Sequence, residues 1–152
     1  MNSVVKRIPS KLLLIGQAPG RNGDPRRPLE GRIAGKMAEL AGVPVGEWLD
    51  RTERMNLLGE FRGKAGKGDA WDAELARKAA DGMKKTIAGR RVLLLGRNVA
   101  RAFGLVDLPW LTWMEAFGAV AGAIPHPSGI VLWWNLSENR EKVSVFLKEA
   151  LR

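Results

Sequence analysis

The chain has 152 residues, 45% of them hydrophobic, and a formal net charge of +9. It contains no cysteine, which excludes disulfides, thiolate catalysis, zinc–thiolate sites and cysteine-held iron–sulfur clusters. The length fits one compact domain over residues 1–152, and the positive charge predicts an anionic partner, of which nucleic acid is the commonest.

The sequence shows no pattern of a membrane or secretory segment. No apolar run approaches the ~20 residues that span a bilayer. The N-terminal stretch MNSVVKRIPSKLLLIG has no small-residue cleavage site. We therefore expect a cytoplasmic monomer that does not contact a membrane.

The hydrophobic pattern, taken in chain order, predicts strands that alternate with helices. The expected strands are residues 12–15, 55–59, 91–96 and 118–127. The expected helices are residues 31–43, 45–51, 70–89, 97–104 and 137–152, and residues 61–69 form a basic loop. Asp69 and Ser137 are the expected N-caps of the helices that follow them. The alternation predicts an α/β fold, with a short, mainly parallel four-stranded sheet between two layers of helices.

Polar segments accompany three of these strands. They are GQAPG at residues 16–20, Asn56 in MNLLG and PHPSG at residues 125–129. Ligands of parallel sheets bind outside the carboxyl ends of the strands. His126 is the only histidine, and the prolines on both sides of it stiffen its backbone. The three segments together are therefore the candidate site.

Several familiar site motifs are absent. Residues 16–20 do not match GxGxxG, and GKAGKGD at 63–69 has neither the first spaced glycine nor the Ser/Thr of a P-loop. One histidine and no cysteine argue against a dedicated transition-metal site. Ser128 lies only two residues from His126, which is typical of a turn and not of a nucleophile–base pair. We expect neither a cofactor nor a metal.

The ordered motifs resemble those of the uracil-DNA glycosylase superfamily. They are GQAPG, PLEGRIAG at 28–35, MNLL at 55–58, VLLLGRNVARAFG at 92–104 and PHPSG. The sequence is most similar to the branch whose first motif reads Gly-Glu-Ala-Pro-Gly and whose last begins His-Pro-Ser. This resemblance covers most of the chain. It implies an enzyme that flips uracil or a related deaminated base out of DNA and hydrolyses its glycosidic bond.

The resemblance also implies roles for individual residues. His126 would donate a hydrogen bond to the oxyanion that develops on the departing base. Asn56 would read the edge of uracil, because an amide both donates and accepts. Gln17 would orient the attacking water. Base or DNA would approach the backbone of the first motif, which comprises Gly16, Ala18, Pro19 and Gly20 besides Gln17.

The last motif implies contacts with DNA. Ser128 and Gly129 would begin a loop that grips the DNA backbone. In the apolar run IVLWW, at 130–134, Leu132 or a tryptophan would wedge into the base stack, or these residues would instead pack under the last helix. Further candidate phosphate contacts are Arg21, Arg26, Arg27, Lys64 and Lys67. The alternative is that these side chains only form a charged surface in contact with solvent.

Three departures from the branch bear on activity. Gln17 replaces a glutamate, and an amide can orient water but cannot take its proton, so Asp24 is the alternative carboxylate unless it only forms the turn in NGDP. Leu29 stands where the branch has a phenylalanine that stacks on uracil, so a looser pocket could admit other deaminated bases. The four cysteines of an iron–sulfur cluster are missing.

These observations leave three hypotheses. The first is a monofunctional DNA glycosylase, since no lysine lies in the pocket motifs to form a Schiff base. The second is a catalytically weak or inactive DNA-binding protein of the same fold that recognises altered bases. The third is an enzyme acting on small molecules such as nucleosides, against which the basic charge and the apolar IVLWW run both argue.

Overall fold

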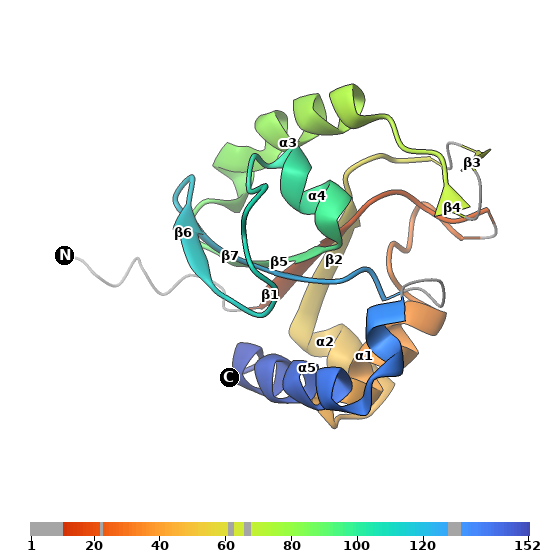
Figure 1. Ribbon diagram of the computed structural model, residues 1–152, viewed down its shortest axis with the longest axis vertical. Helices are drawn as coiled ribbons and strands as arrows, with labels where there is room; N and C mark the ends of the chain where they lie inside the picture. Colours follow the sequence, from red (N-terminus) through yellow and green to blue (C-terminus); the bar gives the residue numbers. More distant parts are fainter. Residues whose placement is uncertain (1–10, 22, 61–62, 66–67, 128–131) are drawn as a thin grey trace.

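The computed structural model describes residues 11–21, 23–60, 63–65, 68–127 and 132–152 (Figure 1). A five-stranded sheet with the order β2-β1-β5-β7-β6 forms its centre. The strands are β1 (Leu12–Gly16), β2 (Thr52–Asn56), β5 (Arg91–Leu95), β6 (Met114–Ala116) and β7 (Ala119–Ile124). The helices are α1 (Arg32–Ala41), α2 (Val45–Arg51), α3 (Ala73–Ile87), α4 (Arg97–Ala102) and α5 (Ser137–Ala150). Within these described ranges, no helix is both long and apolar enough to cross a membrane.

Helices cover both faces of the sheet, as Figure 1 shows. Alternate residues of β1 point to opposite faces, so this strand contributes to two hydrophobic cores. Leu13 and Ile15 belong to the core under α3 and α4. Leu12 and Leu14 belong to the core on the other face, with side chains of α1, α2 and α5. The predicted α/β fold, with two helical layers around a mainly parallel sheet, is confirmed.

The sheet contains one strand more than the sequence predicts. The four expected strands are the parallel ones, and β6 adds an antiparallel edge beside β7. The prediction missed β6 because it is three residues long and its Met114 and Glu115 are exposed, so it carries no hydrophobic alternation. Within the expected basic loop at 61–69, a short hairpin pairs β3 (Lys64–Ala65) with β4 (Gly68–Asp69).

The predicted bounds of the second strand were wrong by three residues. The strand is Thr52–Asn56, not 55–59. Its apolar signal came from Leu57 and Leu58, which are buried but lie beyond the strand. Their backbone N–H groups donate to Gly16 O and Gln17 O at 2.9 Å each, so they tie β2 to the loop after β1.

Both predicted N-caps were also wrong. Asp69 lies in β4, and the cap of α3 is Asp72, whose carboxylate accepts a hydrogen bond from Leu75 N at 3.0 Å. Ser137 is the first helical residue of α5, and the residue before it, Leu136, makes no side-chain capping bond. The apolar face of α5 is as expected, with Val143, Phe146 and Leu147 buried.

Gly122 in β7 offers a test of this packing. A Cβ built on it would lie 2.8 Å from Cε3 of Trp113 and 3.1 Å from Cζ of Phe146, two rings that stack with centroids 4.8 Å apart. We expect Gly122→Ala to lower the free energy of unfolding by about 1–3 kcal/mol in urea denaturation, because the rings must shift. The control is Gly82→Ala in α3, where a Cβ meets nothing within 4 Å and alanine should stabilise the helix. Equal stability of the Gly122 variant and the unmodified protein would contradict the ring placement.

Candidate functional site

The carboxyl ends of the four parallel strands lie in one row. Gly16 at the end of β1 is in register with Asn56 at the end of β2. Ile15 pairs with Leu94 of β5, and Leu95 pairs with Ile124 of β7. The segments that follow these strands therefore start side by side along one edge of the sheet.

The side chain of Asn56 lies beside Gly16 of the first motif. A Cβ at Gly16 would lie only 2.7 Å from Asn56 Oδ1 and 2.8 Å from Leu29 Cδ2, so both side chains occupy space that glycine leaves open. The Oδ1 atom is buried, and among the described residues it has no hydrogen-bond partner. A buried acceptor without a partner is costly, so such an atom points to an external donor.

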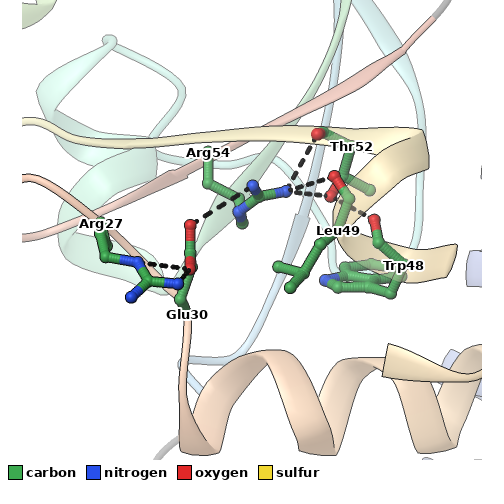
Figure 2. Close-up of polar contacts among 6 residues, drawn as sticks. All are labelled: Arg27, Glu30, Trp48, Leu49, Thr52 and Arg54. Atoms are coloured by element: carbon green, nitrogen blue, oxygen red, sulfur yellow. Dashed lines mark hydrogen bonds and ion pairs between the residues drawn. The ribbon is translucent and has the colours of Figure 1, made fainter. Parts of the chain in front are cut away.

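An ionic network of Arg27, Glu30 and Arg54, shown in Figure 2, adjoins Leu29. Leu29 takes the left-handed conformation with φ of 59°, which is strained for a side chain of this kind. Its neighbour Glu30 lies between Arg27, at 3.1 Å, and Arg54, at 3.7 Å. The Arg54 side chain is only 14% exposed and also donates to Thr52 Oγ1 and O, at 2.6 and 2.9 Å. The network therefore joins the loop carrying Leu29 to β2, two residues before Asn56.

Gln17 turns toward α4. Its Oε1 accepts a hydrogen bond from Asn98 Nδ2 at 3.0 Å in a partly buried setting. Strand alternation agrees with this direction, since Gly16 follows Leu12 and Leu14 on the α1 side and Gln17 follows the residues on the α4 side. The structure thus brings Gly16, Leu29 and Asn56 together and holds Gln17 against Asn98 across the end of β1.

The backbone at His126 is fixed by several contacts. Its carbonyl oxygen accepts a hydrogen bond from Trp134 Nε1 at 2.8 Å, and the flanking Pro125 and Pro127 are buried. Gly96, with φ of 100°, packs against it so closely that a Cβ there would lie 3.2 Å from His126 Cβ. His126 therefore has a fixed backbone position two residues beyond the end of β7, on the same edge of the sheet.

The chain matches no known family model, and no curated protein shows significant similarity to it. The resemblance to uracil-DNA glycosylases therefore rests on the order of the motifs in the sequence.

Asp24 forms a turn within its own loop. Its carboxylate accepts from Arg26 N at 2.9 Å and from Arg26 Nε at 3.3 Å, and its carbonyl accepts from Arg27 N. The backbone and side-chain hydrogen bonds from Arg26 hold the pKa of the Asp24 carboxyl below its usual range. These contacts favour the turn-forming role of Asp24 over the role of alternative catalytic carboxylate.

The other residues of the first motif differ in exposure. Ala18 is half-buried and packs against the core under α3 and α4, and Pro19 is buried. Gly20 is exposed, and a Cβ on it would meet nothing within 4 Å. Gly20 is therefore the most accessible member of this motif.

The apolar run before α5 divides between surface and core. Leu132 and Trp134 lie in a 3₁₀ helix, Leu132–Asn135. Leu132 is 74% exposed, whereas Trp134 is buried in the core with α1 and α5. Leu132 thus stays available as a wedge, while Trp134 packs beside the last helix. Ser128, Gly129 and Lys67 lie outside the described residues, and for Lys64 only the backbone in β3 is described.

The arginines of the loop after β1 are exposed. Arg21 lies at the surface, and the Arg26 and Arg27 side chains are 89% and 70% exposed. Arg26 pairs with Asp24 and Arg27 with Glu30. The Arg26–Asp24 pair, with side chains 89% and 39% exposed, contributes only about 0–1 kcal/mol and holds Arg26 weakly, whereas Glu30 is only 23% exposed.

Two residues that shape this site, Asn98 and Arg54, could not be recognised from the sequence. Asn98 lies within the motif at 92–104, and Arg54 directly precedes the motif at 55–58. Only the fold shows what their side chains contact. Asn98 also lines a cavity of about 420 Å³ between α3 and α4, whose other polar or aromatic walls are Trp71, Glu74, Arg77 and Arg101. Within the described ranges, no group of three or more histidine or acidic side chains is arranged to hold a metal ion.

Proposed function

We propose that this protein is a DNA glycosylase that hydrolyses uracil or a related deaminated base from DNA. The observation that carries the proposal is Asn56 Oδ1, a buried acceptor with no partner among the described residues, at the carboxyl edge of a parallel sheet. The motif resemblance and the net charge of +9 agree with it.

The chemistry of Asn56 suits a deaminated base. Uracil presents a ring N–H between two carbonyl oxygens, whereas cytosine presents a ring nitrogen lone pair at the same position. An unpartnered acceptor favours the ring N–H and repels the lone pair. The amide nitrogen of Asn56 can donate to a neighbouring carbonyl, so one side chain reads two adjacent groups of the flipped base.

Hydrolysis breaks the bond between C1′ of the sugar and the ring nitrogen of the base. The electron pair leaves with the base, the water oxygen bonds to C1′, and the proton lost by water goes to solvent or to the departing base. His126 supports this step by donating a hydrogen bond to a base oxygen as negative charge develops there. The fixed backbone at His126 keeps that donor in place before the reaction.

The surface supports DNA as the substrate. The exposed Arg21, Arg26 and Arg27 follow the first motif directly, where they can contact phosphates on either side of a flipped nucleotide. Leu132 presents an exposed apolar side chain close in sequence to His126 and can occupy the space that the base vacates.

The proposal is tested by incubating excess protein with a labelled oligonucleotide that holds one uracil, followed by alkali cleavage. We expect a cut at the uracil and none at a cytosine in the same position. In Asn56→Leu, which keeps the shape of the side chain but removes the acceptor, the single-turnover rate should fall about 10–100-fold.

The same variant separates function from structure. Because Asn56 Oδ1 has no partner among the described residues, its loss should leave the free energy of unfolding unchanged or raised. Lower activity with equal or higher stability is the expected result. If the unmodified protein makes no cut, even at long times and in excess, uracil excision is excluded as its activity.

A second candidate is a protein that binds altered bases without excising them. The observation that favours it is Gln17, which offers an amide where the related branch has a carboxylate, and which is held by Asn98. Tight, salt-dependent binding to a uracil oligonucleotide with no abasic product would select this candidate.

A further inference from the structure

The hydrogen bond between Gln17 and Asn98 has a direction that bears on the chemistry of the site. Asn98 Nδ2 donates and Gln17 Oε1 accepts, at 3.0 Å. An amide has one oxygen and one NH₂ group, carried on two different arms of the same planar carbon. With the oxygen turned to Asn98, the NH₂ group is the part of Gln17 that points away from α4.

Asn98 is the more rigid partner of the two. It is the second residue of α4, a helix whose Val99, Ala100 and Ala102 are all buried. The start of this helix is tied to the sheet, because Gly96 N donates to Ile124 O at 2.8 Å. Gln17 instead lies just past the end of β1, at the start of a loop. The helix therefore sets the orientation of the loop side chain.

We propose that Asn98 is a positioning residue that makes Gln17 a hydrogen-bond donor to the substrate. This inference rests on the proposed glycosylase function and adds a residue to it. In this arrangement Gln17 donates to a substrate oxygen that gains negative charge as the base leaves. It does not act as the acceptor that draws a proton from water.

The proposal is tested with Asn98→Asp. At neutral pH the new carboxylate can only accept, so it binds the NH₂ group of Gln17 and turns the amide oxygen outward. We expect the single-turnover rate of uracil excision to fall about a hundredfold relative to the unmodified protein, the usual effect of losing one oriented donor. Excess protein keeps any change in DNA affinity out of this rate.

Acid should reverse the effect. A protonated carboxyl group carries an O–H that can donate to Gln17 Oε1, as Asn98 does. The ratio of the variant rate to the unmodified rate should therefore climb toward one as the pH falls through the carboxyl pKa, ordinarily about 3.9. A ratio that stays constant with pH would overturn the proposal, since a merely structural role of Asn98 gives no such return.

Two further variants control for charge and for lost packing. Ala73→Asp places a carboxylate in the wall of the same cavity, on α3, and should give a rate ratio that does not change with pH. Asn98→Ala leaves the Gln17 amide without direction and should lower the rate without recovery in acid. Recovery in either of these would contradict the proposal.

Nuclear magnetic resonance of the free protein separates this inference from the proposed function. In Asn98→Asp, the side-chain NH₂ protons of Gln17 should move downfield as the carboxyl group ionises, and they should not do so in Ala73→Asp. If these signals follow the titration but no base is excised, only the proposed function fails. If the Gln17 NH₂ signals do not change as the carboxyl group titrates, the proposed positioning role of Asn98 is wrong, whatever the activity.

Discussion

Replacing Gln17 with glutamate should add a general base worth about 10²–10⁴-fold at neutral pH and remove an oriented donor worth about a hundredfold, so the rate of uracil excision should rise by up to about a hundredfold. One carboxylate oxygen would keep the hydrogen bond that Asn98 Nδ2 now donates to Gln17 Oε1. The other oxygen would take the place of the NH₂ group and could accept a proton from water. The measurement is the single-turnover rate of Gln17→Glu against that of the unmodified protein.

The pH dependence identifies the cause of this gain. Only the ionised form can act as a base, so the rate ratio should rise with pH through the carboxyl pKa, ordinarily about 4.3, and then level off. Gln17→Ala is the control, since it removes the amide and supplies no carboxylate, and it should not gain activity. A rate ratio that does not change with pH would mean that no water lies within reach of the carboxylate at position 17.

The sequence predicted the layers of this fold because the signals involved are local. Aliphatic runs such as Leu12–Ile15 and Val92–Leu95 read directly as buried parallel strands, and the helical faces follow a period of 3.6 residues. The prediction failed where local signals mislead. Leu57 and Leu58 are as apolar as strand residues, yet they are buried by packing beyond the end of β2.

The candidate site was predicted as a set of segments, because polar residues at parallel strand ends lie on one edge. The directions of the side chains were not predictable. Asn56 ends β2 and Gln17 follows the adjacent β1, and strand alternation sends their side chains to opposite faces of the sheet. Asn98 lies 81 residues from Gln17, and only the pairing of β1 with β5 brings the two together.

Removing the imidazole of His126 should lower the excision rate by about 10²–10³-fold, the usual cost of losing one donor to a developing oxyanion. His126→Ala removes the imidazole but keeps two features that hold the backbone here. The hydrogen bond from Trp134 Nε1 to the His126 carbonyl does not depend on the side chain, nor do the two flanking prolines. Circular dichroism and binding to a uracil oligonucleotide, measured on the same variant, separate a loss of folding or of binding from the loss of this donor.

His126→Gln refines this prediction. Its side chain retains an N–H donor, so it should recover part of the rate if the hydrogen bond matters, and none if the ring acts by transferring a proton. Trp134→Phe addresses the backbone, because it keeps an aromatic ring in the core but removes the N–H that holds the His126 carbonyl. We expect an intermediate rate for that variant. A full rate in His126→Ala would place the oxyanion donor elsewhere on the sheet edge, and Gln17 as oriented by Asn98 is then the donor to test.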